Sequence, residues 1–406
     1  MLKLLFSRFR EAKGKLTIKR CVLGLLLLST VAAVSGCHTV SFYGQAIKGQ
    51  YQIFAHQERI EAMVSSSNTP AALRGRLVVL EDLRAFARTE LKLPADDQYL
   101  KYVDVHRPYV VWNVEAAPEF SLEPKTWWYP LVGSLEYRGY FSKQGATNYA
   151  ASLKRKGYDV SVGGVEAYST LGWFKDPVLN TFIFEPDAEL AEIIFHELGH
   201  QRVFARGDTD FNEAFATSVG EEGARRWLKA KGNPQALSEY LAHLERTRAF
   251  VHLVQKTRER LEALYGDTKT DHGRLKATDK NRSVPPEQLR AEKGQILEDM
   301  KREYAALKER STSDDDYSGW FKHPINNAHL NSVAAYYDFV PGFEQLLADN
   351  GGDLDKYYVA VERLSKESQD DRHAALRRLA QIRLATKAAE QHRVKAVAIR
   401  TPRPDR

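Results

Sequence analysis

The decisive stretch of this 406-residue chain is Phe195-His196-Glu197-Leu198-Gly199-His200-Gln201. Residues four apart on an α-helix share one face, so the imidazoles of His196 and His200 can reach one ion. Zinc accepts neutral imidazole nitrogen, and a catalytic zinc site takes three protein ligands and a water molecule. Glu197 lies beside the first histidine, where its carboxylate can accept a proton from that water without binding the metal. The stretch therefore predicts zinc-assisted hydrolysis, with one zinc ion per chain and Glu197 as general base.

The third ligand is expected on the next helix. The first helix is predicted over 187–205, between Pro186 and Gly207, and the second over about 211–230. Glu213 follows His200 after 12 intervening residues, so an antiparallel second helix can aim its carboxylate at the same ion. The alternative is that 210–213, Asp-Phe-Asn-Glu, is a capping box in which Glu213 serves only the helix N-terminus. Asp208, Asp210 and Thr217 are candidates for hydrogen bonds to the imidazoles.

The N-terminal segment has the pattern of an export signal. Residues 1–36 carry seven basic side chains and one acidic one, which accounts for the whole formal net charge of +6. An apolar run of 14 residues, Cys21 to Val34, follows the basic stretch and is short for a membrane-spanning helix, which needs about 20 residues. The rest of the chain is formally neutral, so the sequence predicts no nucleic-acid partner.

Val34-Ser35-Gly36-Cys37 resembles the lipobox of bacterial lipoproteins. The resemblance implies that residues 1–36 are removed and that Cys37 carries the lipid. His38 replaces the aspartate of an inner-membrane retention signal, so the periplasmic face of the outer membrane is the expected location. The alternative is an uncleaved membrane anchor. Cys21 and Cys37 are the only cysteines, which excludes a disulfide, a cysteine nucleophile and a cysteine-ligated zinc site in the exported domain.

The mature chain divides by composition and periodicity. Helical spacing recurs over 40–92 and 147–156, and β-branched and aromatic runs predict strands over 103–105, 109–114, 158–162 and 181–184. A core is expected over 37–230, a charged helical hairpin over 231–310 and further helices over 311–370. The basic segment 371–406 is expected to be a solvated, fraying tail, with contact to anionic lipid as the alternative.

Several motifs together resemble a known family. His196-Glu197-x-x-His200 followed by Asn212-Glu213-x-Phe215-Ala216 resembles the gluzincin metallopeptidases, which take a glutamate from the following helix as third metal ligand. A bacterial lipoprotein family of predicted zinc aminopeptidases resembles this chain more closely. The matching motifs are Cys37 in its lipobox, Tyr168 to Phe174, Phe195 to Gln201, Gly207-Asp208-Thr209, Phe211 to Ala216, Asn326-Asn327-Ala328 and Tyr336-Tyr337.

This resemblance implies an α+β, zincin-like core, with a small sheet packed on the metal helix and extensive additional helices. It implies that Ala167 to Phe174 binds the peptide backbone as an edge strand, with Tyr168, Ser169 and Gly172 as substrate-binding residues. A buried aromatic loop is the alternative for this segment. Tyr336 or Tyr337 is a candidate donor to the oxyanion, and a core position is the alternative for each.

The expected activity is therefore that of a zinc metallopeptidase with a peptide substrate, and removal of N-terminal residues is the first choice. An endopeptidase acting on envelope proteins is the second choice. A non-catalytic, metal-stabilised lipoprotein that serves as a binding or chaperone platform is the alternative from a different class. A closed pocket beside the metal favours the aminopeptidase, and an open cleft favours the endopeptidase.

Overall fold

The computed structural model describes residues 42–129, 133–167, 175–266, 270–271, 274–275, 284–309 and 317–400. The chain has two compact units, Met1–Ala55 and His56–Arg406. In the first unit residues 42–55 are helical, and the predicted export signal with Cys37 lies outside the described residues. Among the described residues, no helix combines the length and the apolar character that a membrane crossing requires.

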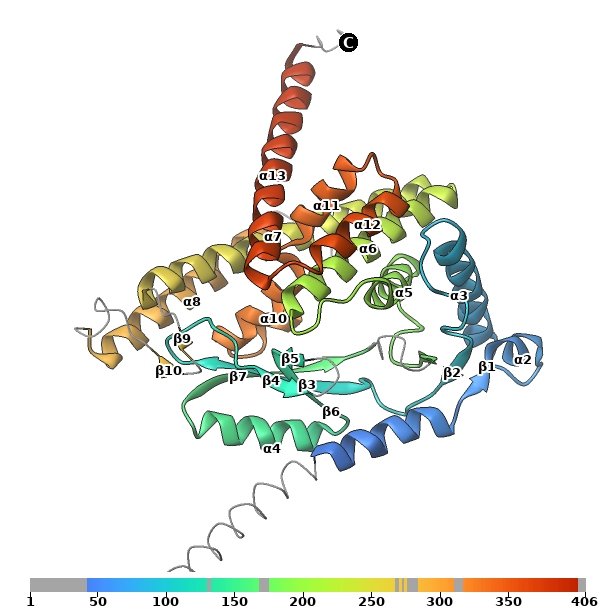
Figure 1. Cartoon of the computed structure of the whole chain (residues 1–406), viewed down its shortest axis with the longest axis horizontal. Helices are drawn as coiled ribbons and strands as arrows, with labels where there is room; N and C mark the ends of the chain where they lie inside the picture. The colour runs from blue at the N-terminus through green and yellow to red at the C-terminus, as the bar shows by residue number, and fades with distance from the viewer. Residues whose placement is uncertain are drawn as a thin grey trace, which may run out of the picture. The chain divides into compact units, whose positions relative to one another are not determined.

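The larger unit is a mixed α+β structure, which confirms the predicted class. Its main sheet has β3 (Val111–Pro118) in the centre, paired antiparallel with β6 (Tyr137–Tyr140) and with β7 (Tyr158–Val165). The helix α4 (Lys143–Lys154) covers one face of this sheet, and α10 (Asn327–Tyr337) covers the other, as Figure 1 shows. Side chains of β3 that point toward α10 are therefore enclosed between a sheet and a helix.

Shorter strands lie outside this sheet. β1 (Glu58–Arg59) pairs antiparallel with β2 (Lys101–Val103), which pairs parallel with β8 (Val178–Leu179). Two antiparallel pairs are β4 (Trp127–Tyr129) with β5 (Gly133–Leu135), and β9 (Thr270–Asp271) with β10 (Arg274–Leu275).

Two predicted strands differ from the structure: only Val103 of the segment 103–105 lies in a strand, and the segment 181–184 is not a strand. Thr181 to Phe184 forms turns, in which the amides of Phe182 and Ile183 both donate to the carbonyl oxygen of Leu179. The Arg76 guanidinium donates to the carbonyl oxygen of Ile183 at 2.8 Å. Phe182 and Ile183 are adjacent and both buried, whereas a half-buried strand would bury alternate residues. A compact turn satisfies the backbone as well as a strand would.

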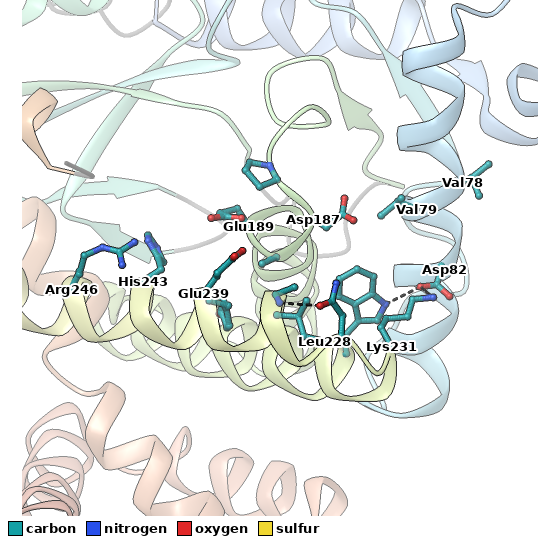
Figure 2. A pocket seen from close by; sticks show the side chains of 16 residues that line it. Val78, Val79, Asp82, Asp187, Glu189, Leu228, Lys231, Glu239, His243 and Arg246 are labelled. Carbon is teal, nitrogen blue, oxygen red and sulfur yellow. Dashed lines mark hydrogen bonds and ion pairs between the residues drawn. The ribbon is translucent and has the colours of Figure 1, made fainter. Parts of the chain in front are cut away.

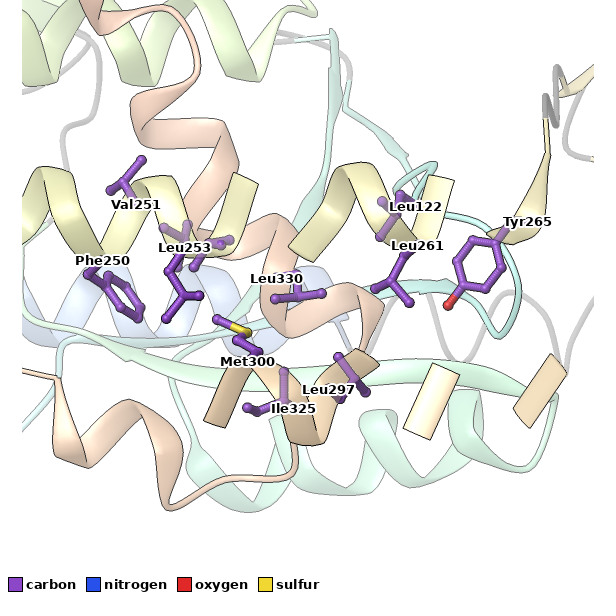
Figure 3. Close-up of a cluster of buried hydrophobic side chains, with 12 residues drawn as sticks. Leu122, Phe250, Val251, Leu253, Leu261, Tyr265, Leu297, Met300, Ile325 and Leu330 are labelled. Atoms are coloured by element: carbon purple, nitrogen blue, oxygen red, sulfur yellow. The ribbon is translucent and has the colours of Figure 1, made fainter. Parts of the chain in front are cut away.

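Two long helices pack together after the core helices. These are α7 (Pro234–Tyr265) and α8 (Pro286–Glu309), within the segment predicted as a charged hairpin. Their apolar faces meet α10 in a hydrophobic cluster that includes Phe250, Leu261, Met300 and Leu330 (Figure 3). The remaining helices are α2 (Ile60–Ser65), α3 (Ala71–Thr89), α5 (Asp187–Arg202), α6 (Thr209–Ala230), α9 (Ser318–Phe321), α11 (Val340–Asp349), α12 (Leu354–Leu364) and α13 (Gln369–Arg400).

The motif Asn326-Asn327 attaches α10 to the sheet. Asn326 caps the helix by accepting a hydrogen bond from the amide of His329 at 3.0 Å. Asn327 is fully buried. Its side-chain Nδ2 lies within 3.0 Å of the carbonyl oxygens of Pro118, Glu119 and Ser121, at the end of β3 and just after it. A buried amide with these partners fixes where the helix begins, and so where Tyr336 lies nearly three turns later.

The basic segment predicted as a fraying tail is a helix over most of its length. Its first turns are buried on the core, since Leu376 is fully buried and Arg372 is 6% exposed. The Arg372 guanidinium donates to Asp208 Oδ2 at 2.8 Å, and His373 Nε2 lies 2.9 Å from Asp208 Oδ1. Asp208 is the N-cap of α6, so the first turn of α13 fixes the helix that carries Glu213. The prediction failed because a high content of basic residues does not reveal a single buried ion pair.

We expect the Asp208–Arg372 pair to behave as a buried salt bridge. Asp208→Asn keeps an acceptor for the helix cap but leaves the guanidinium without a buried counter-charge, and should lower the free energy of unfolding by about 3 kcal/mol. Arg372→Met should cost a similar amount, and the double variant should cost at least about 1 kcal/mol less than the sum. Urea unfolding at pH 7 measures all three, and additivity would contradict direct coupling. Arg59→Met, in an exposed pair with Glu61, is the control and should change little.

Candidate metal centre

The chain reverses direction sharply between α5 and α6. Gly207 adopts a φ of 79°, a conformation that glycine allows without strain. The Asn212 side chain closes the loop by bonding the backbone amide of Ala205 at 2.7 Å and its carbonyl oxygen at 2.8 Å. The cap of α6 is Asp208, whose Oδ1 accepts from the amide of Phe211 at 3.2 Å. The capping-box alternative is therefore wrong, and Glu213 is free to face the first helix.

Small residues let α5 and α6 approach closely. A Cβ atom at Gly220 would lie 2.8 Å from the carbonyl oxygen of Glu192 and 3.3 Å from the Cβ of His196. A Cβ at Gly223 would lie 2.5 Å from the ring of Phe195, and one at Gly199 would lie 3.3 Å from the Cα of Ala216. Gly220 and Gly223 belong to none of the motifs recognised in the sequence. Their three-residue spacing on one helix, 220 and 223, was the available signal.

Three side chains converge at this contact. His196 Nε2 and His200 Nε2 are 3.1 Å apart, and Glu213 Oε2 lies 3.4 Å from the first and 3.5 Å from the second. Ligands at about 2.0–2.1 Å from a tetrahedral zinc ion are about 3.3 Å from one another. The three predicted ligands form a group that could hold a metal ion, and their separations fit zinc without rearrangement.

The electrostatics of this group follow from its burial. Burial lowers the pKa of His196, which favours the neutral, ligating form. Burial also acts against ionisation of Glu213, but the charge and hydrogen bonds of the two imidazoles hold its pKa well below the usual range. For His200, burial is outweighed by the charge of Glu213, so its pKa is raised. An anionic carboxylate beside two imidazoles is the donor set that a divalent cation requires.

Glu197 lies beside the ligand group but does not join it. It is 7% exposed, and its Oε2 has no hydrogen-bond partner among the residues that the structure describes. Burial raises its pKa to about 8, and the charges of Glu213 and Asp176 add to the effect while His200 opposes it. Tyr99, which the sequence analysis missed, is close enough that the charge of Glu197 raises the pKa of its phenol, after burial. An unpartnered buried carboxylate has a proton-acceptor atom available to a substrate or water.

The two candidate tyrosines have different surroundings. Tyr336 stacks on the ring of His196, with centroids 6.1 Å apart at 24°, and its phenol has a raised pKa because of the Glu213 charge and burial. Tyr337 packs instead against the hydrophobic cluster of α7 and α8, near Glu192 and Glu221. Tyr337 as an oxyanion donor is therefore wrong, because successive residues of a helix point about 100° apart.

Two further expectations have different outcomes. Tyr168, Ser169 and Gly172, predicted to bind substrate, lie outside the described residues. Asp208 was expected to bond an imidazole of the ligand group, but it pairs with Arg372 and His373. His200 Nδ1 has no partner in the described part of the chain.

A small cavity of about 30 Å³ adjoins the ligand group. Glu213 and Tyr336 form part of its wall, and other lining residues are Asn113, Glu115, Glu136, Tyr137, Thr209 and Asn331. Most of these lining residues belong to β3, β6 or α10, and Glu136 immediately precedes β6. The sequence analysis missed Glu115 and Tyr137, because no local pattern distinguishes an inward carboxylate or phenol on a mixed strand.

A larger hollow lies elsewhere in the same unit. It has a volume of about 720 Å³ between α3, α5 and α7, and Figure 2 shows the side chains that line it. Asp82 and Lys231 form an ion pair there at 2.8 Å, and Asp82 accepts a hydrogen bond from the Trp227 indole at 2.8 Å. It includes no member of the ligand group, so size alone does not identify the site.

Two packed helices that hold a buried His₂Glu group beside an unpartnered glutamate form the kind of site found in metal-dependent hydrolases. The sequence pattern of a family described as "Putative aminopeptidase" matches residues 41–376, and the chain belongs to that family. No curated protein and no solved structure matches the chain. The family supports a peptidase function for this site.

We predict that Gly220→Ala separates the two helices. Its Cβ would contact a backbone oxygen that cannot rotate away, so the substitution should cost about 1–3 kcal/mol of stability. The shift should also lower the affinity for zinc by at least about tenfold, because the ligands are spread. Competition with a chromophoric chelator measures the affinity. Gly75→Ala, in a helix with open space at that position, is the matched control and should be neutral or slightly stabilising. Unchanged zinc affinity in Gly220→Ala would refute the prediction.

Proposed function

We propose that this protein is a zinc-dependent aminopeptidase that hydrolyses peptide bonds with a water molecule as nucleophile. The observation that carries the proposal is the convergence of His196 Nε2, His200 Nε2 and Glu213 Oε2 within 3.5 Å of one another. Two imidazoles and one carboxylate favour zinc over calcium or magnesium, which prefer oxygen ligands. When bound, zinc supplies a Lewis acid that lowers the pKa of a water molecule and polarises the substrate carbonyl.

The chain's own residues divide the remaining work. Glu197 is the general base: its free, buried Oε2 accepts the proton of the attacking water and returns a proton to the leaving amine. Tyr336, stacked on His196, donates its phenolic hydrogen to the oxygen on which negative charge develops. A phenol in a buried site is already oriented before the reaction, so its dipole costs little reorganisation.

The free carboxylate also separates this proposal from a metal-stabilised binding platform. Burial of an acidic group without a hydrogen-bond partner costs free energy. A metal ion that only stabilised the fold would need its three ligands and gain nothing from Glu197. A reaction that moves a proton requires such a group.

The size of the cavity beside Glu213 favours an exopeptidase. An open cleft for an extended chain needs space on both sides of the scissile bond, whereas this side is limited to about 30 Å³ by β3, β6 and α10. We also propose that the core is zincin-like, which is supported by the two packed helices α5 and α6 that carry the candidate ligands. We further propose that Cys37 is lipidated and that the enzyme faces the periplasm from the outer membrane, with peptides as substrates.

The test of the proposal is a mixed peptide library incubated with the zinc-loaded full chain and read by mass spectrometry. We expect stepwise loss of N-terminal residues. Glu197→Gln should lower the rate by about 10²–10⁴-fold and keep one zinc per chain, because it removes the base and no ligand. His200→Ala should lose the zinc as well as the activity. Internal cuts that depend on Glu197 would overturn the aminopeptidase and keep the metallopeptidase, and zinc loss in Glu197→Gln would contradict its role as a base.

The proposed anchor is tested separately. Cys37→Ser removes the thiol that accepts the lipid, so the variant should leave the membrane fraction and lose the mass of the acyl chains. Cell fractionation and intact-mass measurement follow the two changes, and Cys21→Ser is the matched control because it lies in the apolar run. Persistent membrane association of the Cys37→Ser protein would favour an uncleaved anchor.

A further inference from the structure

The cavity beside Glu213 has room for a small polar group. A water molecule needs about 10–15 Å³ of such space, and this cavity has about 30 Å³. Its lining residues come mainly from β3, α10 and the start of α6. Any group bound there is adjacent to a metal ligand, because Glu213 is part of its wall.

Two polar atoms in this wall have no partner within the described part of the chain. Thr209 is 6% exposed, and its Oγ1 makes no hydrogen bond. The Asn331 amide nitrogen donates to the carbonyl oxygen of Leu122 at 2.8 Å, which leaves Oδ1 as a buried acceptor without a donor. Buried polar atoms are normally satisfied, so two orphans around one cavity indicate a missing donor.

Glu115 supplies a negative charge to the same cavity. It lies on the central strand β3, directly opposite Tyr137 of β6 and Ser161 of β7, so its position is fixed on both sides. No basic side chain among the described residues pairs with it, and burial alone raises its pKa to about 8. Glu136 is another carboxylate in the wall of this cavity. Burial and nearby acids raise its pKa, but the charge of Arg258 lies near enough to oppose them. Glu115 is therefore the carboxylate that lacks a cation.

We propose that this cavity binds the α-ammonium group of the peptide substrate, with Glu115 as its counter-charge. The inference rests on the proposed aminopeptidase function and assigns the residue that recognises the free N-terminus of the substrate. An ammonium group has three donors. The Glu115 carboxylate, Asn331 Oδ1 and Thr209 Oγ1 supply three acceptors.

The reach of a peptide is consistent with this position. Standard bond lengths place the α-nitrogen about 2.5 Å from the carbonyl carbon of the same residue. A charge-assisted hydrogen bond adds about 2.8 Å, so the anchoring carboxylate must lie about 5 Å from the carbon under attack. Glu115 and Glu213 line the same cavity, so a peptide whose α-ammonium group is bound by Glu115 has its first carbonyl group on the side of the candidate metal ligands. Because Glu115 binds the α-ammonium group, it selects for the terminus and not for the residue type.

The experiment compares two peptides of one sequence, one with a free and one with an acetylated N-terminus. For the full chain loaded with zinc, we expect kcat/KM to favour the free peptide by at least about 100-fold. Glu115→Gln keeps the shape and removes the charge, so kcat/KM for the free peptide should fall about 100-fold, mostly through KM. The ratio between the two peptides should then approach one. Glu221→Gln is the matched control, because Glu221 is also buried with a pKa raised to about 8 by burial, but it faces Arg248 at 3.3 Å.

A binding measurement separates the subsite from catalysis. On the inactive Glu197→Gln background, calorimetry with the free peptide should show binding that the additional Glu115→Gln change removes, with zinc content unchanged. Equal Glu197-dependent cleavage of the two peptides by the wild-type protein would overturn the subsite and the aminopeptidase specificity, and would leave the metallopeptidase intact. A loss of preference in Glu136→Gln instead of Glu115→Gln would overturn the residue assignment. No Glu197-dependent cleavage and no binding of either peptide would overturn the proposed function together with the subsite.

Discussion

The close contact between α5 and α6 is the constraint on which the site depends. Glu213 reaches the two imidazoles because the helices approach closely: Gly220 admits a backbone oxygen of α5, and Gly223 leaves room for the Phe195 ring. A glycine inside a helix costs about 1 kcal/mol relative to alanine. This helix carries two such costs at its contact face, which is consistent with selection for the geometry of the ligand group over the stability of an isolated helix.

Four carboxylates in and around the candidate site fall into two pairs. Asp208 and Glu213 are surrounded by guanidinium or imidazole groups, and their pKa values are lowered. Glu115 is half-buried and Glu197 is buried, neither has a paired cation, and burial raises the pKa of each to about 8 even though the His200 charge opposes the shift at Glu197. The first pair fixes the structure, because a paired charge resists movement. Glu115 and Glu197 lack a paired cation, which is unfavourable until a ligand or a proton neutralises the charge. The two proposed roles, binding of the ammonium group and proton transfer, are therefore assigned to these residues.

Segments distant in sequence hold the site together. Asn327 fastens α10 to the end of β3, and so places Tyr336 over His196. Arg372 and His373 hold the cap of α6 from the start of the last helix. Each attachment is a single buried polar contact in a segment of ordinary composition. Such contacts leave no periodic pattern, so the sequence analysis assigned Asn326-Asn327 only by resemblance and mistook the last helix for a tail.

The sequence by itself determined the α+β class and identified the three side chains, His196, His200 and Glu213, that form a group able to hold a metal ion. His196 and His200 lie four residues apart on one helix, and the short interval to Glu213 left few paths for the chain, so local geometry was sufficient. Tertiary structure alone decided that Tyr336 and not Tyr337 faces the site, that Thr181 to Phe184 turns, and that Glu115 lines the cavity. These outcomes depend on which face of an element its neighbours cover. Packing between segments that are remote in sequence decides which face is covered. The spacing of residues along one segment carries no information about that packing.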